Sequence, residues 1–187
     1  MVVQVDTKSI LFSDVKGYSQ LTSAEIEFFF DEFIPDLTKK VIDKDERRKT
    51  FIDINTWGDG LIIVGEDAYE LARTALDLRD YYQQYNWAKK RFPRLTVRIS
   101  LHHGSIYKGH DPIRQRDGVI GTEVTLGARL EPVVTPGEIW CTEIFRGLIK
   151  KDVDFHLEFD DIGEKKLAKD YGLVKTYRLR RETDAPK

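Results

Sequence analysis

The chain has 187 residues, of which 41% are hydrophobic and 33% are charged, and its formal net charge is −2. This length suits one globular domain with a full hydrophobic core, and the composition excludes a disordered chain. The near-neutral charge argues against a nucleic-acid backbone or an anionic membrane surface as the partner.

Apolar periodicity predicts alternating strands and helices. In chain order, we expect a strand over residues 9–15, a helix over 23–42, a hairpin of 50–57 and 61–64, a helix over 68–90 and a strand over 95–106. An exposed arm over 107–118 follows, then a helix over 122–130, strands near 138–141 and 176–179, and a helix over 143–150 between these strands. The order β-α-β-β-α-β with C-terminal additions predicts an α+β, ferredoxin-like fold. In such a fold the helices pack on one face of an antiparallel sheet.

Three local features qualify these elements. Pro35 lies inside the first predicted helix and is expected to kink or split it. Residues 43–49 are all charged or polar, so we expect a solvated connection there. The basic residues 178–181 close to the C-terminus are also expected to be a solvated end.

Compartment and domain organisation follow from what the chain lacks. Cys141 is the only cysteine, which excludes an internal disulfide and makes the cytoplasm the expected location. The N-terminus has no signal-peptide pattern, and no run of eighteen apolar residues predicts a membrane span. We therefore expect one stand-alone cytoplasmic domain over residues 1–187.

Two aspartates follow or interrupt the predicted central strands. Asp14 closes the first strand, and Asp59 lies in the turn Gly58-Asp59-Gly60 between the strands of the hairpin. If the strand end and the hairpin tip lie side by side, both carboxylates can reach the same divalent ions. Taken alone, Gly-Asp-Gly between two apolar runs indicates first of all a hairpin turn.

Four motifs place these aspartates in a wider pattern. They are LFSDVKGYS (residues 11–19), TWGDG (56–60), VRISLHHG (97–104) and IGTEVTLGARLE (120–131), the last followed by PGEI (136–139). In this order they resemble the class III nucleotidyl cyclases, the adenylate and guanylate cyclase superfamily. One such motif is a weak signal, but four in register are a strong one.

The resemblance implies that Asp14 and Asp59, with Val15 beside them, bind two divalent metal ions, Mn²⁺ or Mg²⁺. It also implies a head-to-tail homodimer whose active sites lie at the subunit boundary. One protomer supplies the metal carboxylates, and the other supplies the base pocket and Arg129, which binds the triphosphate. The reaction is attack of the ribose 3′-hydroxyl on the α-phosphate with release of pyrophosphate. Such phosphoryl transfer needs alignment and charge neutralisation more than a protein nucleophile.

Arg129 and Thr125 are expected to act together, because residues four apart share one face of a helix. The planar guanidinium of Arg129 suits phosphate oxygens. Outside this motif, Arg129 would be interpreted as an exposed arginine in an ordinary ion pair. Thr125 replaces the transition-state asparagine of the family, which is a departure from its pattern.

Further residues are predicted to bind phosphates. Lys16 and Gly17, with Tyr18 beside them, precede a helix whose first N–H groups can hold an anion. The family's triphosphate lysine has no clear counterpart, because Tyr171 falls near its place. Lys169 and Lys166 are the candidates.

The base-reading positions also depart from the family. Asn55 stands where adenylate cyclases have a lysine and guanylate cyclases a glutamate. Gly118 stands at the second base-reading position, which is usually Asp, Thr or Cys. The Asn55 amide both donates and accepts hydrogen bonds, so it serves uracil or cytosine equally well. Trp57 and Phe51 lie at even spacing from Asn55, and we expect them to fill the space of a purine, although core packing is the commoner role for Phe51.

These departures make the chain similar to the bacterial pyrimidine cyclases of Pycsar antiphage systems, whose cyclic UMP or cyclic CMP signals to a separate effector. We therefore expect conversion of UTP to cyclic UMP. The alternatives are CTP as the substrate, an adenylate cyclase with an altered base pocket, and a catalytically silent dimerisation or nucleotide-binding module. A diguanylate cyclase is disfavoured by the absence of a Gly-Gly-Asp-Glu-Phe signature, and a polymerase by the near-neutral charge.

His102 and His103 resemble a pair of metal ligands. Neighbours on a strand point to opposite faces, so we expect structural roles for both.

Overall fold

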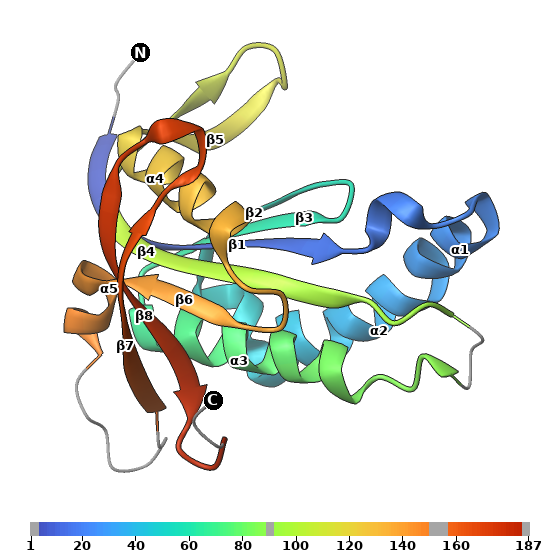
Figure 1. The fold of residues 1–187 in the computed structure, drawn as a ribbon. Coiled ribbons are helices and arrows are strands. Elements are labelled where there is room, and N and C mark those ends of the chain that lie inside the picture. The colour runs from blue at the N-terminus through green and yellow to red at the C-terminus, as the bar shows by residue number, and fades with distance from the viewer. Residues whose placement is uncertain (1–3, 89–91, 150–156, 185–187) are drawn as a thin grey trace.

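Figure 1 shows the computed structural model of the protein, which describes residues 4–88, 92–149 and 157–184. Eight strands form one sheet in the order β2-β3-β1-β4-β6-β8-β7, and β5 pairs with β4 beyond this path. The strands are β1 (Gln4–Lys16), β2 (Phe51–Trp57), β3 (Gly60–Gly65), β4 (Thr96–Asp111), β5 (Arg116–Ile120), β6 (Ile139–Thr142), β7 (Leu157–Lys166) and β8 (Leu173–Arg181).

The predicted α+β class is confirmed, and the first four strands have the order β2-β3-β1-β4 of a ferredoxin-like core. β1 lies at its centre and pairs antiparallel with both β3 and β4. The sheet is not antiparallel throughout, because β6 runs parallel to β4.

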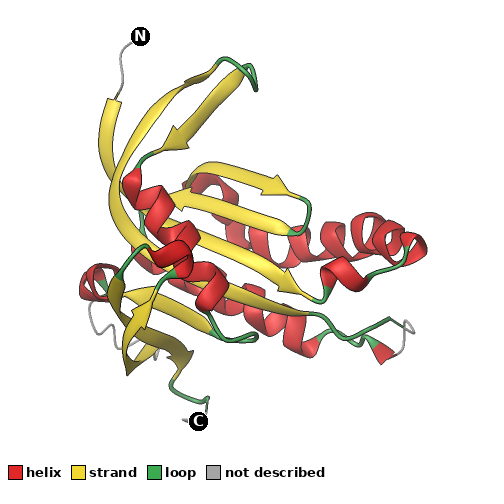
Figure 2. Ribbon diagram, turned by 45° about the horizontal axis from the view of Figure 1, so that its top comes forward, coloured by secondary structure: helices red, strands yellow, loops and turns green. Residues whose placement is uncertain are grey.

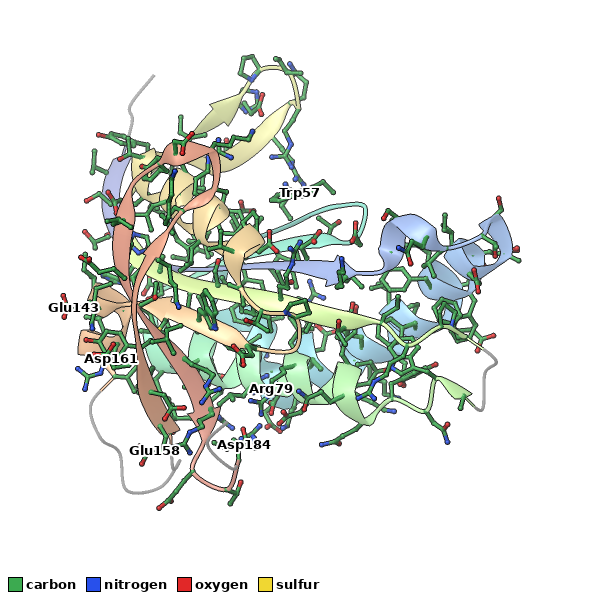
Figure 3. All side chains as sticks on the ribbon, viewed as in Figure 1. Trp57, Arg79, Glu143, Glu158, Asp161 and Asp184 are labelled. Carbon is green, nitrogen blue, oxygen red and sulfur yellow. The ribbon has the colours of Figure 1, made fainter. Side chains whose placement is uncertain are left out.

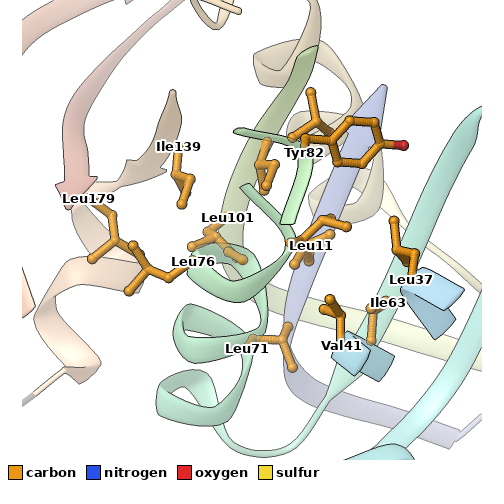
Figure 4. Packing of buried hydrophobic residues seen from close by; sticks show 14 of the residues in the cluster. Leu11, Leu37, Val41, Ile63, Leu71, Leu76, Tyr82, Leu101, Ile139 and Leu179 are labelled. Atoms are coloured by element: carbon orange, nitrogen blue, oxygen red, sulfur yellow. The ribbon is translucent and has the colours of Figure 1, made fainter. Parts of the chain in front are cut away.

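Helices cover both faces of the sheet rather than one (Figure 2). The α-helices are α1 (Ser23–Phe28), α2 (Ile34–Leu37), α3 (Ala68–Gln84), α4 (Thr122–Leu130) and α5 (Glu143–Leu148). Leu11, Ile63 and Leu71 belong to the large cluster beneath α3, part of which is drawn in Figure 4. Ile10 and Phe12 form a second cluster with residues of α4. Successive residues of β1 are thus buried on opposite faces, as a covered central strand requires.

The helix around Pro35 is continuous. π-helical turns at Phe29–Phe33 and Thr38–Ile42 flank α2 and carry the chain from α1 to residue 42. The chain therefore stays helical on both sides of Pro35, although proline has no backbone N–H to donate.

The charged segment after this helix is not simply solvated. The segment Lys44–Thr50 contains 3-10 turns interrupted at Asp45 and Glu46, whose φ angles are 52° and 60°, and Arg47 within it is only 2% exposed. The Arg47 guanidinium lies 2.5 Å from Glu70 and 3.0 Å from Asp77, both on α3, and donates to the Val41 carbonyl at 3.0 Å. A buried guanidinium needs such partners, and the packed α3 helix supplies both of the carboxylates.

Two strands were missed from the sequence. β5 turns the predicted arm into a hairpin with the outer part of β4. β7 contains mostly charged residues and lies at the sheet edge, so no apolar alternation indicates it. Its Asp160 pairs with Arg178 at 2.7 Å and Arg180 at 3.0 Å, so these arginines are not a free solvated end.

The helix α3 ends at Gln84, earlier than predicted. The predicted ends of α3 and α5, Lys90 and Lys150, lie outside the described residues. The chain turns back at Tyr85 so that Trp87 packs against Phe33, with 4.9 Å between ring centroids. None of the helices within the described ranges is long and apolar enough to cross a bilayer.

Candidate functional site

The structure brings Asp14 and Asp59 together at one end of the central strands. β1 and β3 remain paired up to Ser13 opposite Leu61, so the β2–β3 turn lies beside the end of β1. The Asp59 carboxylate accepts a hydrogen bond from the Val15 backbone N–H at 3.3 Å. The strand end and the hairpin tip are therefore adjacent, and the backbone N–H of Val15 links them.

The electrostatics of this pair suit a bound cation. Burial raises the pKa of the Asp59 carboxyl above its ordinary value, and the negative charge of Asp14 raises it further, although backbone donors such as Val15 oppose the shift. A carboxyl whose ionised form is disfavoured by burial and by a neighbouring carboxylate gains from a cation bound beside it. Across the described part of the chain, this site included, no group of three or more His, Cys, Asp or Glu side chains is placed to hold a metal ion, so the candidate ligands are these two carboxylates.

Arg98 and Glu131 complete the surroundings of Asp14, and the sequence did not single them out. Arg98 lies directly opposite Asp14 in the β1–β4 ladder and forms an ion pair with it. Its Nε lies 3.0 Å from Glu131 Oε1, but the two atoms are not aligned as a hydrogen bond. Burial raises the pKa of Glu131 to about 7, which Arg98 opposes and the two aspartates reinforce. The alternating sequence pattern identified Arg98 only as a polar residue of its strand. The β1–β4 register places it opposite Asp14, whose counterion it is.

A cavity of about 310 Å³ lies between β2, β5 and α4, and we call it the β2–α4 cavity. It is lined by Phe12, Asp53, Asn55, Trp57, Ile62, Arg114, Val119, Val124, Thr125, Ala128 and Arg129. Four predicted site residues thus share one cavity, and neither Asp14 nor Asp59 is among its lining residues. Gly118 is not brought there; it lines a separate hollow of the β4–β5 hairpin.

Asn55 meets two arginines from the hairpin. Its side-chain oxygen accepts hydrogen bonds from Arg114 Nη2, at 2.7 Å, and from Arg116 Nη2. Asp53, two residues before Asn55, lines the same cavity, and burial raises the pKa of its carboxyl while Arg114 opposes the rise. The sequence offered no sign of these arginines at Asn55, because the hairpin that carries them was expected to be a loose arm.

Trp57 occupies the open edge of the cavity and Phe51 lies elsewhere. Trp57 is 55% exposed, lies beneath the β4–β5 hairpin in Figure 3, and has its ring centroid 6.2 Å from that of Phe12. The expectation that Phe51 shares the face of Asn55 is wrong. A register shift between Phe51 and Asp53 breaks the two-residue alternation, and Phe51 packs against the large cluster beneath α3.

Helix α4 supplies Thr125 and Arg129. Both line the β2–α4 cavity, as their four-residue spacing predicted. The Thr125 hydroxyl donates to the Gly121 carbonyl at 3.2 Å. Among the described residues, no carboxylate forms an ion pair with Arg129, so the ordinary ion-pair interpretation of this arginine is not supported.

The position of α4 depends on His102, which is 1% exposed. Its Nε2 contacts Glu123 of α4 at 2.7 Å, and its Nδ1 contacts Thr142 at 2.9 Å. His103 instead contacts Ser9 at 2.9 Å, so the two histidines have different partners, as expected for neighbours on a strand.

We expect His102 to make the fold less stable in mild acid. Burial lowers the pKa of His102 below its ordinary 6.5, although Glu123 opposes this. The unfolded chain therefore binds a proton before the folded chain does, and stability is lost as the pH falls below about 6.5. Urea unfolding of the wild type and His102→Gln at pH 7.5 and 5.5 should show a smaller loss of stability on acidification in the variant. The same loss in both proteins would contradict this, and His110→Gln, in the exposed hairpin, serves as the control.

The predicted phosphate-binding residues occupy the turn after β1 and the β7–β8 connection. Gly17 has a φ of 100°, and a 3-10 turn, Tyr18–Gln20, separates it from α1. The Tyr18 ring packs against Phe29, with 5.3 Å between centroids. The first turn of α1 is capped by Thr22 and Glu25, so the expected helix start does not directly follow Gly17. Lys169 is exposed in the 3-10 turn Ala168–Asp170, and Lys166 pairs with Asp170 at 2.6 Å. The phosphate role of these residues remains a prediction.

Comparisons with known proteins agree with this geometry. Residues 2–181 match the family described as "Adenylate and Guanylate cyclase catalytic domain". An adenylate cyclase of Anabaena cylindrica is 27% identical over 137 residues, which are 66% of this chain but only 26% of that protein. The chain thus spans about a quarter of the length of this curated relative.

Solved structures show the same fold. The adenylyl cyclase CyaB from P. aeruginosa matches with a TM-score of 0.78 and 19% identity, covering 100% of this chain and 98% of that one. The guanylate cyclase domain of RhGC from Catenaria anguillulae, solved in complex with GTP, matches with a TM-score of 0.76 and 17% identity, covering 95% of this chain and 98% of that one.

Proposed function

The chain belongs to the adenylate and guanylate cyclase catalytic domain family, and from this premise we propose that it converts UTP to 3′,5′-cyclic UMP and pyrophosphate. The observation that carries the proposal is the β2–α4 cavity, in which an asparagine held by two arginines stands where the purine-reading lysine or glutamate is expected. Trp57 supports a smaller base, because its large ring lines the same cavity and would compete with a purine for space there.

Asp14 and Asp59 would hold two divalent ions, Mn²⁺ or Mg²⁺, with the Val15 backbone beside them. Such ions lower the pKa of an attacking hydroxyl and stabilise the charge of a leaving triphosphate. The raised pKa of Asp59, caused by burial and by the negative charge of Asp14, is the feature of this chain that fits such ions. Arg98 would remain the counterion that positions Asp14 from β4.

Arg129 and Thr125 would act on the phosphates from the other side of the substrate. The planar guanidinium can neutralise charge that develops on the phosphate oxygens, and the Thr125 hydroxyl can donate a hydrogen bond there. Lys16, Gly17, Tyr18 and Lys169 are the proposed additional contacts to the triphosphate.

A head-to-tail homodimer would unite the two halves. Because the β2–α4 cavity is lined by Arg129 and Thr125 but not by Asp14 or Asp59, a single protomer separates the two sets of residues. A two-fold pair of chains can bring the carboxylates of one protomer to the cavity of its partner, and then contains two equivalent sites. The cyclic nucleotide would serve as a second messenger in bacterial antiphage defence, read by a separate cyclic-nucleotide-binding effector.

The test is incubation of the purified protein with Mn²⁺ and each of ATP, GTP, CTP and UTP, with cyclic products separated and quantified. We expect cyclic UMP as the main product. Cyclic CMP as the main product would support the cytidylate alternative, and cyclic AMP would overturn the pyrimidine proposal. No product from any nucleotide would favour a catalytically silent module.

A further inference from the structure

We propose that Arg114 and Arg116, on the β4–β5 hairpin, determine base specificity by fixing the orientation of the Asn55 amide so that uracil is selected over cytosine. The inference rests on the proposed pyrimidine cyclase function and deepens it. The hairpin would then be part of the base-recognition apparatus, and the arginines would be positioning residues for Asn55.

The two hydrogen bonds allow only one orientation of the amide. A guanidinium carries donors and no acceptor, and an asparagine side chain has one oxygen acceptor and one NH₂ donor. Both Arg114 and Arg116 therefore must meet the Asn55 oxygen, as the structure shows. The ambiguity between amide oxygen and nitrogen, which usually has to be assigned from the hydrogen-bond network, is removed here by two donors on the same atom.

The arginines are free to take this role. Asn55 is the hydrogen-bond partner of both, and within the described ranges neither forms an ion pair with a carboxylate. Gly118 lies close to Arg114, since a Cβ at position 118 would have Arg114 Nη1 as its nearest neighbour, at the ordinary contact distance of 3.9 Å.

The fixed amide presents a donor to the β2–α4 cavity. With its oxygen occupied, Asn55 can offer only its NH₂ group to a base, and Asp53 in the same cavity offers acceptor oxygens. Uracil matches this pattern with its O4 carbonyl and its N3–H group. Cytosine presents an amino donor and an N3 acceptor at the same edge, so both contacts would be mismatched. A site built to hydrogen-bond one pattern discriminates strongly against the reverse pattern, because its polar groups are left unpaired.

The test compares kcat/KM for UTP and CTP in the wild type, Arg114→Gln/Arg116→Gln and Asn55→Asp. In the double variant, we expect the ratio of kcat/KM for UTP to kcat/KM for CTP to fall at least about tenfold. The freed Asn55 amide can then rotate and accept a hydrogen bond from the amino group of cytosine. Asn55→Asp offers only acceptors and should turn the preference toward CTP. Arg48→Gln is the matched control, since it removes an exposed arginine that pairs with Asp43 far from the cavity.

Binding of 3′-deoxy-UTP and 3′-deoxy-CTP, which cannot cyclise, gives a second readout of the same preference. An unchanged UTP-to-CTP ratio in active variants would overturn the inference and leave the cyclase proposal intact. An equal loss of activity with UTP and CTP, and of binding with their two 3′-deoxy analogues, would indicate that the arginines contact the phosphates. That result would also overturn the inference. If the wild type forms no pyrimidine product, the proposed function itself fails, and the two failures are thereby distinguished.

Discussion

Asp59→Asn is expected to reduce kcat/KM at least about a thousandfold while the protein remains folded. The asparagine has nearly the same shape and can still accept the Val15 hydrogen bond, so the β2–β3 turn should be retained. It lacks the charge that would attract a divalent ion. Because burial and Asp14 already disfavour the ionised Asp59, removing its charge should not destabilise the metal-free protein.

Two measurements separate the loss of metal from the loss of fold. Thermal unfolding with and without Mn²⁺ should show a stabilisation by the ion in the wild type that is absent in Asp59→Asn. Asp31→Asn, at an exposed position on the first helical segment, should behave like the wild type in both activity and unfolding. If Asp59→Asn retained a tenth or more of the wild-type activity, Asp59 would not be a metal ligand in the reaction.

The second large effect is expected from mixing two inactive variants. Arg129→Ala should lose about two to three orders of magnitude in kcat, because a phosphate-neutralising group is removed. If active sites are shared between protomers, a heterodimer of Asp59→Asn with Arg129→Ala contains one site in which both residues are intact. Random exchange makes half of the dimers mixed, so about one quarter of the wild-type activity should return.

This recovery is measured as specific activity after mixing, with heterodimer formation followed by differently tagged chains. Asp59→Asn mixed with Asp14→Asn is the matched control, because both changes affect the same half of the site and no intact site can form. Heterodimers without any recovered activity would contradict the shared-site arrangement. In that case, both residues would have to act within one protomer instead of across the subunit boundary.

The two sets of proposed catalytic residues lie in different parts of the protomer. The carboxylates lie at the end of β1 and in the β2–β3 turn, whereas Arg129 lines a cavity that they do not reach. The catalytic roles of these residues are the ones that we propose from the family. For the choice of base, we propose Asn55 and the two hairpin arginines that donate to its oxygen.

The order of the first elements and the pairing of the two aspartates could be predicted from the sequence. Strand and helix periodicity is a local property, and Asp14 and Asp59 stand next to strong apolar runs whose hairpin turn contains two glycines. The spacing of Thr125 and Arg129 likewise places both on one helical face without any knowledge of the tertiary structure.

Long-range register decided the rest. Arg98 becomes the partner of Asp14 only through the β1–β4 ladder, a separation of 84 residues, and Phe51 leaves the face of Asn55 only because of a bulge. The burial of Arg47 depends on carboxylates of α3, and α4 lies on the opposite face of the sheet from the other helices. No local pattern carries these pairings.

The amino-acid sequence by itself thus determined which side chains carry charge, which segments alternate, and that an amide stands at position 55, where we propose that the base is read. Only the tertiary structure decided which way that amide can be used, since Arg114 and Arg116 reach it across 59 and 61 residues of chain. The physical reason is that an isolated asparagine donates and accepts alike, and its preference is set by the neighbours that folding places around it.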